Sequence, residues 1–471
     1  MKNKFIFFLL LTVTLAFFTS CDSNGGFQLP FSGGDDAKNK TAIEIYEAAE
    51  ANMEKLDSYT VTGGMDLGMS VYGKSIVVES DIVAKTQTTE DGKFLYWEET
   101  NTTSTYDETV SKHLFVEGFQ DEYMYQYYSD DETSTELRSL ISTENYKEYM
   151  KSKADDIDFG IDDFAKQEKK DVDNGWKLIF SELSPNKGIE YLNDTFAFSD
   201  MDLGVSVKDV TMIFTVNSDY YFTDMYMEFI FESDAESDEG AVVQQPKMIA
   251  EESYSGFNST VVEKRNITNF NLVSDLRCID KAADAFDKLL RSEKIDFTIK
   301  APNSVNSAYT EIYDVNYSLN NGKPTYVMLI ELKSATGVAS EASITYSDGK
   351  KIVTSNGAAS TQESDDLTEK ATIRSLLLPI RFDAQRVRSI TTDGEALVFE
   401  MKATKQEMEQ LLGGAAHGGR YECDFIISVL YDGDMIKEYS YNIVVRRITT
   451  TGVGIVLNVK YTVPELSYDA D

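Results

Sequence analysis

Histidine, the side chain on which enzymes most often rely for acid–base chemistry, is almost absent from this chain. Its 471 residues include two histidines, His113 in "KHLFVEGF" and His417 in "GGAAHGGR". The first stretch predicts a strand and the second a flexible turn. Neither places a histidine beside a serine or cysteine in a recognisable nucleophile motif. We therefore expect both histidines to be structural or solvated, and the protein to be no enzyme and to use no cofactor.

Carboxylates are abundant, with 80 Asp and Glu against 44 Lys and Arg. Two acidic stretches, residues 155–164 and 171–175, come close to the ligand spacing of a twelve-residue calcium loop. In the first, Ile157 and Phe159 occupy positions that need oxygen ligands. In the second, Gly175 stands fifth where the loop requires a glycine sixth. The sequence thus favours solvated acidic turns and predicts no metal site.

Cys21 is the residue whose spacing suggests a covalent modification. Lys2 and Lys4 precede an apolar run of 14 residues, from Phe5 to Phe18, which is shorter than the roughly 20 residues that span a bilayer. Thr19-Ser20-Cys21 follows and resembles a bacterial lipobox, with Phe18 where an aliphatic residue is usual. Residues 1–20 are predicted to be a signal peptide and Cys21 to carry diacylglycerol. The alternative is an ordinary secretory signal with an incidental cysteine.

Residues 21–40 are typical of a flexible tether, because they are rich in Gly, Ser, Asp and Asn and have no apolar periodicity. A coil of about 20 residues spans roughly 25 Å. We therefore expect a cell-membrane protein, anchored by lipid and facing the extracytoplasmic side.

Net charge narrows the range of partners. The formal charge is −36, and loss of Lys2 and Lys4 with the signal peptide makes it −38. Such a charge disfavours nucleic acid and anionic lipid headgroups. Cys278 and Cys423 remain besides Cys21, too few for a disulfide scaffold. We expect buried thiols, and the sequence leaves open whether they pair.

A helix followed by a strand opens the folded part. Thr41 and Glu44 form a capping box, and the next apolar residues share one helical face. In "SYTVTGGMDLGMSVYG", the apolar residues from Tyr59 to Val71 alternate along one long strand, or along two strands joined at Gly63-Gly64.

The same order of landmarks recurs later in the chain. A helix beginning near Asp275 precedes further alternating strands. "DGKFLYW" from Asp91 pairs with "DGKKIVT" from Asp348, and "GWKLIF" from Gly175 pairs with "GEALVF" from Gly394. These matches predict two tandem units, residues 41–270 and 275–466. The spacing of the landmarks makes the tyrosine-rich stretch Glu122–Leu137 an insert in the first unit.

Grouped strands between isolated helices indicate an α+β fold. The stretch "AAEANMEKLDSYTVTGGMDLGMSVYG", Ala48 to Gly73, resembles the start of proteins in the lipoprotein-carrier (LolA/LprG-like) superfamily. The resemblance implies that each unit is a strongly curved antiparallel sheet, a half-barrel, wrapped around helices and an apolar cavity. It also implies a non-catalytic binding protein for a lipid or another apolar ligand.

The side chains expected to line that cavity come from the first helix and strand. They are Met53, Leu56, Tyr59, Met65, Leu67 and Met69. The same pattern is compatible with a simple packed core, and that alternative stays open. A second functional hypothesis is an envelope sensor or assembly partner that binds another envelope protein through the tyrosine-rich stretch, since aromatic residues are enriched at interfaces.

Overall fold

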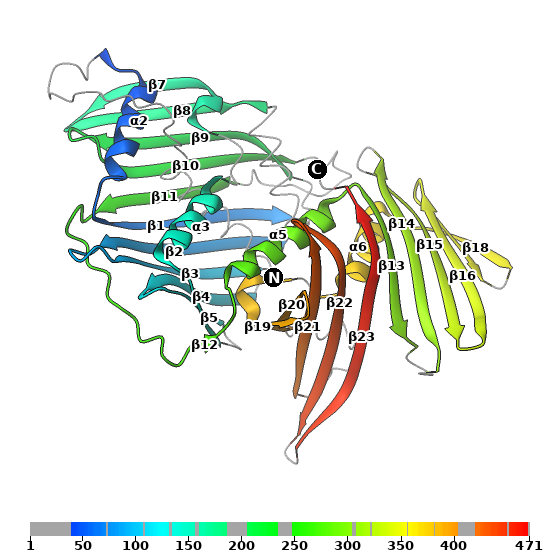
Figure 1. The fold of residues 1–471 in the computed structure, drawn as a ribbon. Helices are drawn as coiled ribbons and strands as arrows, with labels where there is room; N and C mark the ends of the chain where they lie inside the picture. Colours follow the sequence, from blue (N-terminus) through cyan, green and yellow to red (C-terminus); the bar gives the residue numbers. More distant parts are fainter. Residues whose placement is uncertain are drawn as a thin grey trace. The chain divides into compact units, whose positions relative to one another are not determined.

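The computed structural model describes residues 39–469 except 72–73, 107–108, 131–133, 156–159, 186–204, 234–246, 304–307, 321–322, 356, 381, 404–419 and 450–451. The chain divides into two compact units, Met1–Phe270 and Asn271–Asp471. Each is built on one large antiparallel sheet (Figure 1). Within the described part of the chain, no helix has the length and apolar character needed to cross a membrane.

The first sheet has 12 strands in the order β12-β6-β5-β4-β3-β2-β1-β11-β10-β9-β8-β7. Its strands are β1 (Ser58–Val71), β2 (Lys74–Thr88), β3 (Phe94–Tyr106), β4 (Thr109–Gln120), β5 (Tyr123–Asp130), β6 (Ser134–Leu140), β7 (Phe164–Val172), β8 (Gly175–Leu183), β9 (Val205–Asn217), β10 (Phe222–Ser233), β11 (Lys247–Ser255) and β12 (Asn271–Leu272). The helices are α2 (Ala42–Met53), α3 (Thr143–Asp155) and the 3₁₀ turn η2 (Ile161–Asp163).

The second sheet has 11 strands in the order β18-β17-β16-β15-β14-β13-β23-β22-β21-β20-β19. Its strands are β13 (Lys294–Pro302), β14 (Thr310–Asn320), β15 (Lys323–Ser334), β16 (Gly337–Ser347), β17 (Lys350–Ser355), β18 (Ala358–Glu363), β19 (Val387–Asp393), β20 (Ala396–Lys402), β21 (Arg420–Asp432), β22 (Met435–Thr449) and β23 (Gly452–Tyr468). The helices are α5 (Arg277–Arg291), α6 (Asp366–Leu377) and the 3₁₀ turn η4 (Ala384–Arg386).

The two sheets follow the same chain path. In each, a helix precedes the first strand, six strands run outward as hairpins to one edge, and a helix and a 3₁₀ turn lead to the other edge. Five strands then return to the middle, so that the last pairs with the first: β11 with β1, and β23 with β13. The two-residue strand β12 is an addition at the edge of the first sheet.

The predicted α+β half-barrels are wrong. Strands make up most of the described chain, and both sheets are open, ending at β7 and β12 in one and at β18 and β19 in the other. In each sheet the first and last strands of the unit pair with each other in the middle. The two free edges therefore lie at opposite ends of the ladder and do not meet to close a barrel. The few helices cover part of one sheet face and do not fill the interior of a barrel.

Strand order also corrects two details. "DGKFLYW" follows the turn between β2 and β3, whereas "DGKKIVT" follows the turn between β16 and β17, whose counterpart in the first sheet joins β4 to β5. The tyrosine-rich stretch Glu122–Leu137 contains β5 and the start of β6, so it belongs to the sheet and is no insert.

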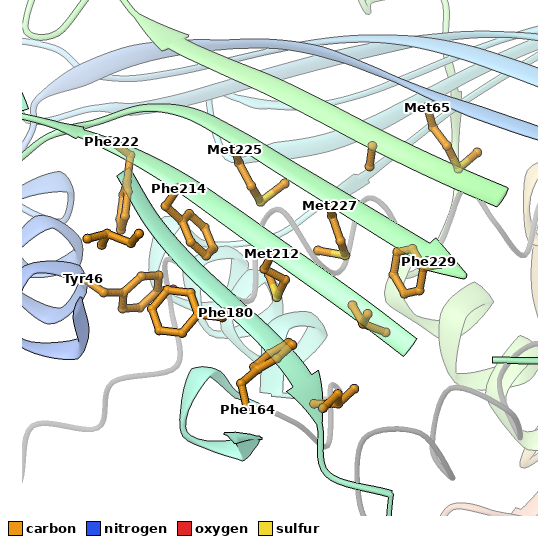
Figure 2. Packing of buried hydrophobic residues seen from close by; sticks show 14 of the residues in the cluster. Tyr46, Met65, Phe164, Phe180, Met212, Phe214, Phe222, Met225, Met227 and Phe229 are labelled. Carbon is orange, nitrogen blue, oxygen red and sulfur yellow. The ribbon is translucent and has the colours of Figure 1, made fainter. Parts of the chain in front are cut away.

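Helix α2 is fixed to the first sheet by a cap and by aromatic packing. Thr41 Oγ1 accepts from Glu44 N at 3.2 Å and the Glu44 carboxylate accepts from Thr41 N at 2.7 Å, which confirms the capping box. Tyr46 contacts the rings of Phe180, Phe214 and Phe222, with centroids 5.0–6.1 Å apart (Figure 2). The helix therefore lies on the half of the sheet formed by β7–β10.

Candidate functional site

The structure brings most of the predicted lining residues together on one face of the first sheet. Met53 of α2 and Met65 and Leu67 of β1 are 2%, 1% and 2% exposed, and they belong to one apolar cluster. Leu56 and Tyr59 are partly buried against the same cluster. Met69 lies on β1, but its side chain is outside the described residues. These residues pack as core, and their part in binding a ligand stays a prediction.

This apolar cluster contains more methionines than those of α2 and β1. Sulfur-bearing side chains converge from α2 and four strands. Figure 2 shows four of them, Met65, Met212, Met225 and Met227. They are Met53, Met65, Met212, Met225, Met227 and Met248, each no more than 2% exposed. Methionine is unbranched and polarizable, so it repacks around irregular shapes more easily than leucine or valine. We call this half of the face, formed by α2, β1 and β7–β11, the methionine half.

The same sheet face changes character at β3. Residues directly opposite each other in the ladder share a face, so the register from Met65 to Ser80 to Thr102 carries the methionine face onto β3. There the alternate residues Glu98, Thr100 and Thr102 are buried at 3%, 1% and 5% exposure. The sequence of β3 is "FLYWEETNTTSTY", which is typical of a solvent-exposed edge strand. In the structure, three of its polar side chains are nevertheless buried.

Glu98 is not alone on this face. Glu117 of β4 stands directly opposite it in the ladder and is 2% exposed. Paired Cβ atoms in such positions are about 5 Å apart, and like charges placed there repel. Each carboxylate has a donor: Tyr96 Oη donates to Glu98, and Gln126 Nε2 donates to Glu117 at 3.2 Å.

A third buried carboxylate reaches this region from β11. Glu252 is 3% exposed and accepts a 2.5 Å hydrogen bond from Tyr254 Oη. It stands opposite Gly63 of β1. A Cβ on Gly63 would lie 2.9 Å from Glu252 Cγ, so the missing side chain leaves the space that Glu252 occupies. Gly63 therefore lies inside one continuous strand, and the two-strand alternative is excluded.

The electrostatics of Glu252 show that the two sides of the face interact. Its pKa is raised to about 8: burial is the largest cause, the hydrogen bond from Tyr254 opposes it, and the charge of Glu98 adds to the rise. Burial and then the charge of Glu252 raise the pKa of Tyr59 to about 12. No lysine or arginine contributes to the pKa of Glu252. We call Glu98, Glu117, Glu252 and their tyrosine and glutamine neighbours the acidic half.

Helix α3 covers the acidic half with Tyr146. Its ring stacks on Phe119 with centroids 4.5 Å apart. Burial raises the pKa of this tyrosine well above its usual range, and the charges of Glu117 and Glu98 raise it further. Among the described residues its hydroxyl has no hydrogen-bond partner. The phenol is therefore a buried polar group that feels the charge of two carboxylates and bonds to neither.

In or beside the acidic half, the buried atoms Glu252 Oε1, Thr100 Oγ1 and Tyr146 Oη have no hydrogen-bond partner among the described residues. Leaving such a group unsatisfied costs about 1–3 kcal/mol. These costs collect beside the apolar cluster of the methionine half. The arrangement can accept a ligand that supplies hydrogen-bond donors at one end and hydrocarbon at the other.

The second unit handles its buried carboxylate differently. Glu369 of α6 is 1% exposed and accepts from Tyr326, from Ser364 Oγ at 2.6 Å and from Lys351 Nζ at 3.0 Å. Burial alone would raise its pKa, but these donors and the lysine charge lower it overall. Glu369 is thus neutralised within the protein.

The structure places three of the remaining residues singled out by sequence, His113, Cys278 and Cys423. His113 Nδ1 lies 2.9 Å from Tyr128 Oη, which donates to Asp130 at 3.0 Å. Cys278 and Cys423 do not pair in a disulfide; Cys423 is buried, whereas Cys278 is half-buried. Cys21 and His417 lie outside the described residues, as do residues 1–20, predicted to be a signal peptide, and nearly all of the tether predicted at 21–40.

The tyrosine-rich strand β5 is covered rather than displayed. Tyr125 is 1% exposed and packs with Val116, Ile267 and Phe270 on the sheet face opposite α3. The segment before the unit boundary is held there by Gln120, which donates to and accepts from the Arg265 backbone at 2.7 and 2.9 Å. A role of this stretch in binding an envelope partner stays a prediction.

No family model matches the chain, and no curated protein sequence matches it. Among solved structures, lipoprotein LppX of Mycobacterium tuberculosis matches with a TM-score of 0.23 at 10% identity, covering 49% of this chain and 100% of LppX. A putative AttH of Nitrosomonas europaea matches at 0.11 and 7%, covering 86% and 92%. A DUF1329-family protein of Desulfovibrio piger matches at 0.16 and 11%, covering 50% and 96%. All three TM-scores lie below 0.5, so we base no inference about fold or ligand on these likenesses.

Proposed function

We propose that the protein is a lipid-anchored extracytoplasmic binding protein, non-catalytic, whose first unit holds an apolar or amphiphilic ligand between its sheet and its helices. The observation that supports it best is the methionine half. Six buried methionines, five on one sheet face and one on α2, suit a site that must repack around a flexible chain.

Two further features belong to the proposal. The cavity-lining role of Met53, Leu56, Tyr59, Met65, Leu67 and Met69 extends to the methionines of β9–β11, which face the same cluster. The shared strand order suggests that the two units are a tandem repeat. The anchor at Cys21 would keep the protein at the membrane, the source of such ligands.

The test uses purified protein with an uncharged apolar dye, N-phenyl-1-naphthylamine, and native mass spectrometry. We expect dye fluorescence to rise on binding, dodecanol to displace the dye, and a lipid-sized mass to accompany the intact protein. The absence of both dye binding and a co-purified lipid would contradict the proposal.

The position of the ligand is tested by substitutions that make the side chains of the methionine half less adaptable. The double variant Met212→Leu, Met227→Leu keeps volume but removes adaptability, so we expect dye affinity to fall about tenfold with the fold unchanged. The control is Met401→Leu, since Met401 is fully buried in the second unit. Equal losses in both variants would place binding elsewhere.

A further inference from the structure

The boundary between the methionine half and the acidic half runs along two strands. On β11, Met248 and Ala250 face the apolar cluster, and two positions further on Glu252 faces the same side. On β1, Met65 is two positions from Gly63, over which Glu252 lies. A linear amphiphile lying along β1 and β11 would have its hydrocarbon chain beside the methionines and its head group beside the carboxyl group of Glu252.

We propose that the acidic half receives the protonated amine of a cationic amphiphile whose hydrocarbon chain lies on the methionine half. This inference rests on the function proposed above and adds the class of ligand. Carboxyl groups from β3, β4 and β11 bring acceptor oxygens to a water-poor region. An ammonium group carries three donors and no acceptor, which suits a region of buried acceptor oxygens.

The unsatisfied atoms are a second, independent observation. Glu252 Oε1, Thr100 Oγ1 and Tyr146 Oη are each at least nine-tenths buried in side chains that are 3%, 1% and 0% exposed, and none makes a hydrogen bond. The Tyr146 hydroxyl interacts electrostatically with both Glu117 and Glu98, which places it in the acidic half. Oxygen atoms of this kind are what an amine head group would pair with.

Other ligands fit less well. A fatty acid would bring a fourth carboxylate to three. In the described part of the chain, no group of three His, Cys, Asp or Glu residues could hold a metal ion. The tyrosine rings around the carboxylates add favourable faces for a cation, as ammonium groups bind over aromatic rings.

Binding of an ammonium group is expected to release a proton from Glu252. The titratable groups that act on Glu252 are Tyr59 of β1, Glu98 of β3 and Tyr254 of β11. Glu117 of β4 and Tyr146 of α3 lie beyond Glu98. Helix α2 carries the buried Glu50. With a pKa of about 8 it holds a proton at pH 7 in the empty site. The ammonium would favour the carboxylate form, so the proton of Glu252 is released to buffer as the ion pair forms.

The experiment is titration calorimetry of the full chain with dodecylammonium, dodecanol and dodecanoate at pH 7, each below its micelle concentration. Repeating it in two buffers of different ionisation enthalpy measures proton release. We expect dodecylammonium to bind at least tenfold tighter than dodecanol, dodecanoate to bind weakest, and close to one proton to be released per dodecylammonium.

Variants decide where the head group binds. Glu252→Gln and Glu98→Gln keep side-chain volume, and unchanged dodecanol affinity shows that the fold is intact. We expect both to bring dodecylammonium affinity down to that of dodecanol and to abolish proton release. Glu369→Gln, at the buried carboxylate of the second unit, should change neither.

Three results would overturn the inference. Equal binding of dodecylammonium and dodecanol would mean that only the chain is recognised, and the proposed function would stand alone. Dodecylammonium affinity that is unchanged in both variants would indicate adsorption to the acidic surface. Binding of none of the three probes would overturn the proposed function as well.

Discussion

Glu252 lies over Gly63, its partner across the β1–β11 ladder. A Cβ built on Gly63 would stand 2.9 Å from Cγ of Glu252 and 2.3 Å from the carbonyl oxygen of Glu251. Real Cβ atoms do not approach other atoms this closely, so a glycine is required for the two strands to pair with Glu252 turned inward.

Gly63→Ala should therefore destabilise the first unit by about 1–3 kcal/mol, because the new methyl group overpacks a closed position. Both tryptophans, Trp97 and Trp176, lie in this unit, so tryptophan fluorescence during urea unfolding reports on it alone. Gly68→Ala on the same strand is the control, since nothing lies within 4 Å of its Cβ. Equal stability of the two variants would contradict the packing described.

The raised pKa of Glu252 predicts how stability depends on pH. The folded protein binds the Glu252 proton up to about pH 8, whereas the unfolded chain releases it near its ordinary value of 4.5. The folded state thus holds more protons between these values, and this group's contribution to stability falls as pH rises, by about 1.4 kcal/mol per pH unit.

Glu252→Gln removes that contribution while keeping an acceptor for Tyr254. We expect wild type and variant to be similarly stable near pH 5 and the variant to be the more stable by about 2–3 kcal/mol at pH 7.5. Tryptophan fluorescence in urea at pH 5, 6, 7 and 7.5 measures the difference. Parallel pH profiles would show that Glu252 titrates normally in the folded protein.

Local signals in the sequence predicted local structure. The capping box at Thr41 and Glu44 is confirmed, and Asp275 Oδ1 accepts from the backbone of Arg277, the first residue of α5. The alternation from Tyr59 to Leu67 correctly places Val61, Met65 and Leu67 on the buried face. Caps and short periodicities depend on neighbours within a few residues, so they can be predicted directly.

Long-range pairing could not be predicted in this way. Met65 pairs with Ala250, 185 positions later, and that contact decides that the sheet stays open and which helices cover it. The acidic half was missed for a related reason. In β3, Glu98, Thr100 and Thr102 alternate with polar neighbours, so sequence gives no sign of which side is buried. The useful signal was the glycine at position 63, opposite the glutamate.

The two units should fold separately, because every paired strand of the second sheet lies within 294–468 and the first sheet is complete by residue 272. Fragments 39–274 and 275–469 should each show β-type circular dichroism and one cooperative unfolding transition. The sum of their spectra should match that of residues 39–469. An unfolded fragment 275–469 would show that the second sheet depends on the first unit.

Lys351 should matter in the second unit because it neutralises Glu369. Lys351→Ala leaves a carboxylate that is 1% exposed with only Tyr326 and Ser364 as donors, which should cost about 3 kcal/mol at pH 7. The pKa of Glu369 is lowered in the folded protein, so its contribution is present above the unfolded pKa and is lost as pH falls. The penalty in the variant should shrink below about pH 4.5.

Fragment 275–469 contains no tryptophan, so its tyrosine fluorescence reports the unfolding of this unit. Lys350→Ala, at the exposed neighbouring position, is the matched control and should change stability by less than about 0.5 kcal/mol. Equal effects of both substitutions would mean that Tyr326 and Ser364 alone satisfy the carboxylate.

Cys21 should decide where the mature protein resides. A thiol modified with diacylglycerol brings two acyl chains, each stabilised in the bilayer by about 0.8 kcal/mol per buried methylene, which suffices for stable anchoring. The Cys21→Ser variant lacks the sulfur that accepts the lipid, so it should lose incorporated palmitate label and move from the membrane fraction to the soluble extracytoplasmic fraction. Cys278→Ser should keep both label and membrane association. If wild type and Cys21→Ser were both soluble and unlabelled, residues 1–20 would be an ordinary secretory signal and Cys21 incidental.

Because the second unit and most of the first are unaffected by this substitution, binding of the apolar dye should survive release, which separates anchoring from ligand binding.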